Sequence, residues 1–495
     1  RVIMDEFKIE DNISYKNLFK PYGYINGEWI DLPKGKSFNI YNPSTNKIIA
    51  TMPEMGIDET KYAIESAKIA FDKWKKKTAK ERCFLLRKWY DLVLENIDDL
   101  SVIMTLENGK PLKESKAEII YASSFIDWFS EEGKRTYGRS IPATQIDKRI
   151  ITIKQPVGVS ALITPWNFPA AMITRKVAPA LAAGCSVIIK PAEQTPLSAS
   201  ALVYLAQKAG IPKGVINLLV ANNPIPIGKE LCENESVRKI SFTGSTEVGK
   251  ILIKDSANSV KKVSMELGGN APLIVFNDAD VDIAVKETLA SKYRNSGQTC
   301  VCANRIFVQD GIYKKYSEAL AKKVADFKVG DGFEHTSDIG PLIDNSGLKK
   351  VERHLDDAIA KGAKVLTGGK QPSLGGLYYE PTVLTEVAKN MVLFKEETFG
   401  PLAPLFKFKD VDEVINMANN TNYGLAGYIF TKDLNTAWKV SEELQFGMVG
   451  INSGILSTEV APFGGVKESG IGREGAVEGM DEYMEIKYLC FGNIM

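Results

Sequence analysis

Histidine is nearly absent from this chain, because His335 and His354 are the only two among 495 residues. His354, in VERHLDDAIAKG, is typical of a helix surface, and His335, in DGFEHTSDIG, is typical of a loop. A Ser/His/Asp or Cys/His mechanism would need one of them. We therefore expect any catalytic base to be a carboxylate.

Other scarcities limit the class of protein. Six cysteines spread over the chain do not make a disulfide framework, which favours a reducing compartment. No apolar run approaches the roughly 20 residues that cross a bilayer, and residues 1–5 are not followed by an apolar secretion segment. A net charge of +1 provides no field for nucleic acid or an anionic membrane. We expect a cytoplasmic protein, although a mitochondrial matrix protein whose presequence was removed would share these features.

The chain is long enough for two or three domains. Its first 135 residues are mainly helical. The segment CFLLRKWYDLVLENIDDLSVIMTLENGKP predicts a helix that stops at Gly109 and Pro111. The segment before it, IDETKYAIESAKIAFDKWKKK, predicts a helix with one apolar face, formed by Ala63, Ala67, Ile69, Ala70 and Trp74.

Short apolar runs then alternate with helical patterns, in the rhythm of βαβ units. These runs are GVSALIT, SVIIK, VINLLV, RKISFTG, KKVSMEL and APLIVF, and a second series extends from RIFVQD to MVGINSG. The fold is predicted to be α/β with parallel sheets. Two further alternating segments, KRIITIKQ and EYMEIKYLCFG, predict strands that project from the main domains toward a partner subunit.

The segment ISFTGSTEVGKILI nearly matches a phosphate-binding P-loop, with Gly244, Gly249 and Lys250 in place. Ile251 replaces the hydroxyl residue that ligates magnesium, and too few glycines are present for a G-x-G-x-x-G fingerprint. Two interpretations remain equally open. Either the backbone N–H groups at this helix start bind a pyrophosphate, or the glycines serve only the turn.

The segment IIKPAEQTPLSA places Lys190 and Glu193 at the carboxyl end of a predicted strand, where open α/β sheets bind ligands. A carboxylate there accepts hydrogen bonds from both ribose hydroxyls and repels a 2′-phosphate, which favours NAD over NADP. The alternative is that both charges are solvated loop residues.

Cys300 and Cys302, in NSGQTCVCANR, stand one residue apart. Taken alone, they could form a catalytic nucleophile, half of a metal site, a redox pair or two ordinary thiols. A metal site needs three or four ligands, and no further Cys or His stands at ligand spacing, so zinc is not expected.

Several segments together resemble the NAD(P)-dependent aldehyde dehydrogenase superfamily in order and spacing, from about Tyr24 to the end of the chain. They are ITPWNFP, KPAEQTP, FTGSTEVG, MELGGNAP, NSGQTCVCANR, EETFGP, NYGLAGYIF and PFGGVKESGIGREG. Within that superfamily the chain most resembles succinate-semialdehyde dehydrogenases.

The resemblance implies the aldehyde dehydrogenase fold, with a Rossmann-like coenzyme domain, an α/β catalytic domain and a small β oligomerisation arm. The coenzyme domain would take residues 1–135 and 156–267, and the catalytic domain residues 268–455. Residues 136–155 and 456–495 would form the oligomerisation segments, together with a loop that lines the active site. A homodimer or homotetramer is implied.

The resemblance also assigns the chemistry. Cys300 matches the nucleophile, which forms a thiohemiacetal and then a thioester, and Glu266 matches the general base. Asn167 matches the side-chain donor to the oxyanion, beside the backbone N–H of Cys300. The matching coenzyme-binding residues are Trp166, Lys190, Pro191, Ala192, Glu193, Gly244, Ser245, Gly249, Glu397 and Phe399. The implied cofactor is NAD, with NADP as the alternative, and no metal is implied.

Three further residues match the contacts of a substrate carboxylate in succinate-semialdehyde dehydrogenases, namely Arg175, Arg294 and Ser457. Arginine presents fixed donors to a carboxylate and stays charged. The alternative is that either arginine pairs with an internal acid such as Glu107 or Glu118. Succinate semialdehyde is the expected substrate, and glutarate semialdehyde, one methylene longer, is its closest competitor.

In some members of that subfamily the pair matching Cys300 and Cys302 closes into a disulfide that stops activity. A Cys-x-Cys ring is small and strained, hence reducible. The alternative for Cys302 is simple packing. Two other function classes are also considered, a coenzyme-independent cysteine esterase and a non-enzymatic relative. The intact KPAE and EETFGP segments argue against the first, and the retained catalytic residues argue against the second.

Overall fold

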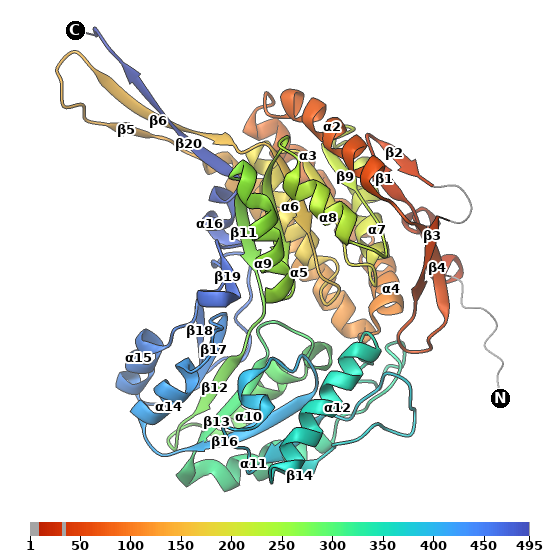
Figure 1. Cartoon of the computed structure of the whole chain (residues 1–495), viewed down its shortest axis with the longest axis vertical. Coiled ribbons are helices and arrows are strands. Elements are labelled where there is room, and N and C mark those ends of the chain that lie inside the picture. Colours follow the sequence, from red (N-terminus) through yellow and green to blue (C-terminus); the bar gives the residue numbers. More distant parts are fainter. Residues whose placement is uncertain (1–8, 32–35, 495) are drawn as a thin grey trace.

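The computed structural model describes residues 9–31 and 36–494. Two α/β units lie one above the other, and a ribbon of three strands projects from the upper unit (Figure 1). The predicted α/β class with parallel sheets is therefore confirmed. Residues 1–5, which the sequence analysis used against a secretion segment, lie outside the described residues.

The upper unit is built on an eight-stranded sheet in the order β19-β11-β10-β7-β8-β9-β1-β2. Every apolar run predicted as a strand in this half forms one, and together they make its parallel centre. These strands are β7 (Val159–Ile163), β8 (Val187–Lys190), β9 (Ile216–Leu218), β10 (Val237–Thr243) and β11 (Lys262–Glu266). Antiparallel partners complete the sheet, namely β1 (Gly23–Ile25), β2 (Glu28–Ile30) and β19 (Gly470–Ile471), while β3 (Ser37–Tyr41) and β4 (Ile48–Pro53) form a separate hairpin.

Helices pack on this sheet and bury one continuous apolar core. They are α1 (Ile9–Asn12), α2 (Ile57–Trp74), α3 (Ala79–Glu95), α4 (Ile97–Asn108), α5 (Leu112–Glu132), α6 (Ala171–Ala183), α7 (Pro196–Lys208), α8 (Ile225–Glu233) and α9 (Thr246–Ser256).

Two details of the helical region differ from the prediction. Ile69, assigned to the buried face of α2, is 56% exposed. The helix predicted to reach Gly109 is two helices, because Asn96 leaves helical geometry and its Nδ2 donates to the Leu92 carbonyl over 2.8 Å. The predicted stop is confirmed, since Gly109 ends α4 in the left-handed region with φ of 86°.

The lower unit is built on a seven-stranded sheet in the order β14-β15-β16-β13-β12-β17-β18. Its strands are β12 (Ala271–Val275), β13 (Ala303–Gln309), β14 (Lys364–Thr367), β15 (Thr382–Thr385), β16 (Leu402–Phe408), β17 (Ala426–Phe430) and β18 (Met448–Ile451). Its helices are α10 (Val281–Lys292), α11 (Asp310–Ala325), α12 (Asn345–Ala360), α13 (Val392–Lys395), α14 (Val411–Asn419) and α15 (Leu434–Glu443).

The projecting arm consists of β5 (Arg139–Ile141), β6 (Arg149–Pro156) and β20 (Met484–Phe491), with α16 (Ala476–Asp481) leading into β20. The two alternating segments pair antiparallel along their whole length, as projecting strands would (Figure 1). Ile146, Ile486 and Tyr488 are 93%, 64% and 60% exposed. Contact of this arm with a partner subunit remains a prediction. In the described part of the chain, no helix combines the length and the apolar character needed to cross a membrane.

Candidate active site

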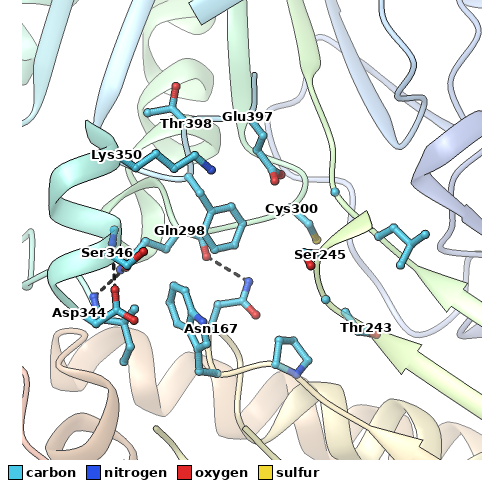
Figure 2. Close-up of a pocket in the computed structure, with 18 of the residues that line it drawn as sticks. Asn167, Thr243, Ser245, Gln298, Cys300, Asp344, Ser346, Lys350, Glu397 and Thr398 are labelled. Atoms are coloured by element: carbon cyan, nitrogen blue, oxygen red, sulfur yellow. Dashed lines mark hydrogen bonds between the residues drawn. The ribbon is translucent and has the colours of Figure 1, made fainter. Parts of the chain in front are cut away.

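A cavity of about 390 Å³ is lined by loops of both units (Figure 2). The upper unit contributes the loops after β7, β10 and β11. The lower unit contributes the turn before β13, the start of α12 and the loop before β16. The lining residues are Pro165–Asn167, Met172, Thr243–Ser245, Leu267, Gly268, Gln298, Cys300, Ile343, Asp344, Ser346, Gly347, Lys350 and Glu397–Phe399.

Cys300 stands on an unusual turn at the cavity wall. The short helix η4 (Arg294–Gly297) precedes it, and Asn295 and Ser296 hold left-handed φ angles of 50° and 58°. The turn also passes close to Gly269, where an added Cβ would lie 2.5 Å from the Cys300 carbonyl oxygen. A larger residue at position 269 would therefore displace the backbone of the predicted nucleophile.

The Cys300 thiol is held in its protonated form. Burial is the main cause that raises the pKa of Cys300 to about 12. Arg175 lowers this pKa, whereas Glu397 and Glu266 raise it further. Attack by Cys300 on a carbonyl carbon therefore requires a base that removes the thiol proton.

Asn167 is fixed from several sides. Its Nδ2 donates to the Gln298 carbonyl over 3.1 Å (Figure 2). The main-chain carbonyl of Asn167 accepts from Lys110 Nζ at 2.7 Å and from Asn295 Nδ2 at 3.0 Å. Lys110 in turn pairs with Glu118 at 2.5 Å, and both side chains are 1% exposed. The predicted oxyanion donor is therefore held by a buried ion pair that the sequence analysis did not identify.

Glu266 ends β11 as a buried carboxyl. Neither of its oxygens has a hydrogen-bond partner among the described residues. Burial, followed by the charge of Glu474, raises the pKa of Glu266 well above its usual value. An added Cβ at Gly464 would lie 2.9 Å from Glu266 Oε1, so this glycine leaves room for the carboxyl. An unpartnered carboxyl with a raised pKa is suited to accept and release a proton.

Arg175 forms an internal ion pair. Its Nε contacts Glu474, which also contacts Lys176, and all three side chains are buried. The guanidinium lies 4.2 Å from the centre of the Phe463 ring. One of its terminal nitrogens reaches the cavity-lining Met172, at 3.2 Å from Sδ. Arg175 is therefore neutralised by Glu474 on one side and packs behind the cavity-lining Met172 on the other, without lining the cavity itself.

The acids considered as partners of Arg175 are engaged elsewhere. Glu107 accepts from the backbone N–H groups of Leu197 and Ser198, at 2.7 and 2.8 Å, and so caps the start of α7. Glu118 belongs to the ion pair beneath Asn167. The internal partner of Arg175 is an acid that the sequence analysis had not considered.

Arg294 and Ser457 occupy different segments. The Arg294 guanidinium lies 5.2 Å from the centre of the Phe168 ring, and its buried Nε has no hydrogen-bond partner among the described residues. Ser457 is half-buried in the loop between β18 and β19. The three residues predicted to bind a substrate carboxylate thus come from α6, η4 and this loop.

The predicted coenzyme residues divide into two groups. Those that line the cavity are Trp166, Gly244, Ser245, Glu397 and Phe399. Ser245 also caps α9 by accepting from Val248 N–H at 3.3 Å. The rings of Trp166 and Phe399 meet edge to face at 5.6 Å.

The remaining coenzyme residues lie outside that lining. Lys190 ends β8, and Pro191, Ala192 and Glu193 follow it. Lys190 Nζ donates to the Pro191 carbonyl at 2.7 Å and lies 3.8 Å from Glu193. Gly249 lies within α9, where an added Cβ would meet Leu267 at 2.4 Å. In the structure, Gly249 therefore serves the packing of α9 against the strand end.

Two features escaped sequence analysis. The start of α12 contributes Lys350 to the cavity, and Figure 2 shows its ammonium pointing toward Glu397. His354, one turn later, was predicted on a helix surface, but its side chain is fully buried. That prediction was wrong because the loop that covers His354 lies about 40 residues further along the chain. The burial of this histidine could have been predicted only from its position on the apolar side of α12, near Val351 and Leu355.

Cys302 is 3% exposed, and all six cysteines are free. Its thiol donates to the Gly297 carbonyl over 3.3 Å, and Lys292 Nζ lies 3.8 Å from its sulfur. Within the described residues, no cluster of three or more His, Cys, Asp or Glu side chains is arranged to hold a metal ion.

The sequence profile of the aldehyde dehydrogenase family matches residues 29–489. A protein of Pseudomonas putida named glutarate-semialdehyde dehydrogenase is 57% identical, over 96% of this chain and 98% of its own. An Escherichia coli protein named succinate-semialdehyde dehydrogenase [NADP(+)] is 56% identical, over 96% and 98%. A Pseudomonas putida protein named 3-sulfolactaldehyde dehydrogenase is 54% identical, over 97% and 98%.

Solved structures agree in fold. One described as an Escherichia coli NADP-dependent enzyme superposes with a TM-score of 0.96 at 55% identity, covering 97% of this chain and all of that one. A betaine aldehyde dehydrogenase of Staphylococcus aureus in complex with NAD⁺ superposes with a TM-score of 0.94 at 36% identity, covering 98% and 97%.

Proposed function

Because this chain belongs to the aldehyde dehydrogenase family, we propose that it oxidises succinate semialdehyde to succinate with NAD⁺. The observation that carries the substrate class is Arg294, in η4 just before Cys300, whose buried Nε has no hydrogen-bond partner among the described residues. A buried guanidinium with an unused donor beside the predicted nucleophile supports a carboxylate-bearing aldehyde held beside Cys300.

The residues of the cavity fit a dinucleotide. The start of α9, with Gly244 and Ser245, presents backbone N–H groups suited to a pyrophosphate. The carboxylate of Glu397 borders the same cavity and suits the nicotinamide ribose. Lys190 and Glu193 suit the adenosine ribose. A nicotinamide dinucleotide bound there would supply a hydride acceptor for the carbon attached to Cys300.

The chain's own residues perform the remaining steps. Cys300 attacks the aldehyde carbon, and Glu266 accepts the thiol proton, so that a thiohemiacetal anion forms on Cys300. Asn167 Nδ2 and the Cys300 backbone N–H stabilise its oxygen. After hydride loss, a thioester remains on Cys300. Glu266 releases the first proton to solvent and then takes a proton from water, which attacks the thioester. Collapse of the tetrahedral species releases the acid and expels the Cys300 thiolate, which takes the proton back from Glu266.

Coenzyme preference is proposed from Glu193. Its carboxylate would accept ribose hydroxyls and repel a 2′-phosphate, which favours NAD⁺. The Escherichia coli relative is named for NADP⁺, so both coenzymes have to be compared.

The exposed apolar side chains of the arm support a further proposal, association into a homodimer or homotetramer through β5, β6 and β20. We also propose a cytoplasmic location.

The test measures initial NADH and NADPH formation with succinate semialdehyde, glutarate semialdehyde and uncharged butanal under reducing conditions. We expect strong preference for succinate semialdehyde with NAD⁺, and loss of that preference in Arg294→Ala. One methylene contributes about 1–3 kcal/mol, so glutarate semialdehyde is expected to follow within roughly 200-fold. Equal rates with butanal would overturn the carboxylate-bearing substrate.

A further inference from the structure

His354 connects two walls of the coenzyme cavity, namely α12 and the loop that carries Glu397. The imidazole is fully buried on α12, with Nδ1 3.1 Å from Thr398 Oγ1 and Nε2 3.2 Å from Glu396 Oε2. Thr398 lines the cavity, and Glu396 and Thr398 flank Glu397 in the chain. One histidine therefore contacts the residue on each side of the predicted ribose-binding carboxylate.

The ring is satisfied in its neutral form. Arg353 pairs with Glu396 and also lies 3.2 Å from His354 Nε2. One tautomer donates to Glu396 and accepts from Thr398, and the other accepts from Arg353 and donates to Thr398. Both tautomers keep α12 attached to the same loop.

The loop that carries Glu397 is held in place by side chains from neighbouring elements. Asn304, at the start of β13, donates to the Glu396 carbonyl at 2.9 Å and accepts from Thr398 N–H at 3.0 Å. Phe399 holds a left-handed φ of 55°, which an aromatic residue keeps only when its surroundings enforce it. Asn304 holds the loop backbone, whereas His354 holds its side chains.

The wall opposite the Glu397 loop is formed by α12. Lys350 lies one turn before His354 and borders the cavity. Burial raises the pKa of Glu397 to about 7, and Lys350 is the largest influence that lowers it. The separation between Lys350 and Glu397 therefore affects the charge that the cavity offers to a ribose.

We propose that His354 is a positioning residue for the coenzyme, which sets the distance between the Lys350 wall and the Glu397 loop through its bonds to Thr398 and Glu396. The inference rests on the proposed function only in that a nicotinamide dinucleotide occupies this cavity. The identity of the aldehyde does not enter it.

The test compares binding of NAD⁺ and NADH, by calorimetry and NADH fluorescence, in the full-length protein without aldehyde. Loss of both ring contacts in His354→Phe is expected to raise Kd by about tenfold, as for the loss of one or two buried hydrogen bonds. Thr398→Val is expected to raise Kd by several-fold, with no further effect when it is added to His354→Phe. His354→Asn, whose amide overlays Nδ1, is expected to recover most of the affinity.

Hydrolysis of p-nitrophenyl acetate without coenzyme checks that Cys300 remains functional, and the melting temperature records stability separately. Unchanged Kd in His354→Phe, with a lowered melting temperature, would overturn the inference and leave the histidine a core residue. Failure to oxidise succinate semialdehyde with normal coenzyme binding would overturn the proposed function alone. Absence of any coenzyme binding by the unsubstituted protein would overturn both.

Discussion

The Lys110 ammonium donates to the Asn167 main-chain carbonyl over 2.7 Å, from a side chain that is 1% exposed. A buried charge thus orients the residue predicted to stabilise the oxyanion. The second partner, Glu118, accepts from the backbone N–H groups of Ala170 and Ala171 at 3.0 and 3.3 Å, so the pair also holds the start of α6.

Replacing Lys110 by Met is expected to slow catalysis and to destabilise the fold. It leaves Glu118 as an unpaired buried charge, which costs about 3–5 kcal/mol. It also frees Asn167, and we expect kcat to fall by roughly tenfold or more, toward the loss seen when an oxyanion donor is removed. Urea unfolding and steady-state kinetics measure the two effects.

Lys113→Met is the matched control. Lys113 lies three residues further along, on α5, and pairs with Asp338 at 2.6 Å, but its side chain is 56% exposed. Its loss is expected to cost less than about 1 kcal/mol and to leave kcat unchanged. Equal kinetic effects in the two variants would contradict the role assigned to Lys110.

Alkylation of Cys300 is expected to quicken with pH without reaching a plateau. A pKa of about 12 leaves the thiolate a minor species at every pH that the protein tolerates. A small free thiol, with a pKa of about 8.5, provides the comparison and levels off near pH 10. Iodoacetamide labelling followed by peptide mass spectrometry gives the rate at Cys300 alone. A plateau near neutral pH would show that the thiolate forms without a base.

Mild hydroperoxide is expected to inactivate the protein reversibly. With hydrogen peroxide as the oxidant, one thiolate of the Cys300 and Cys302 pair would attack the peroxide to give a sulfenic acid and water, and the second thiol would displace water to form the disulfide.

Free-thiol counts and activity are followed together, before and after reduction. Cys302→Ala is expected to remain active and to lose the reversible phase. Reversible inactivation that persists in Cys302→Ala would exclude the pair as a switch.

His354 is expected to make stability depend on pH in the acid range. Burial lowers the pKa of His354 to about 4, with Arg353 and Lys350 acting in the same direction and Glu396 opposing them. The unfolded value is about 6.5. Because the unfolded chain binds the proton first, this residue's stabilising contribution is complete above pH 6.5 and is lost as pH falls toward 4.

Urea unfolding at several pH values between 7 and 4 measures this dependence, and His354→Gln is the reference. Asp357, which also interacts electrostatically with the histidine, is kept unchanged in both proteins. Carboxylates elsewhere contribute equally to the two proteins. If the free energy of unfolding changes with pH equally in both proteins, His354 is not the source of the acid-range dependence.

Most of the architecture was predictable, because its determinants are local. The run RKISFTG is apolar enough to be buried on both faces and forms β10 as expected. Gly109 ends α4 because a left-handed residue is needed there. By contrast, Asn96 ends a helix in the middle of a continuous apolar pattern, because its side chain bonds to a backbone carbonyl of the preceding turn. The apolar periodicity of a sequence does not reveal such a bond between side chain and backbone.

The candidate site was predictable only where motifs carry it. Cys300, Asn167 and Glu397 line one cavity, as the resemblance implied. Arg175, however, pairs with Glu474, and nothing local to either residue reveals a partner so distant in sequence. His354 was missed for the same reason, since Glu396 and Thr398 lie beyond two intervening strands.

The C-terminal strand has a practical consequence for protein engineering. Glu474, which neutralises Arg175 and Lys176, stands two residues before α16, and α16 continues directly into β20 of the arm. The same short segment that leads into the arm therefore influences the charge around Glu266, the predicted general base. Deleting the arm to obtain a smaller protein, or fusing a bulky tag close to β20, is expected to alter the electrostatics around Glu266.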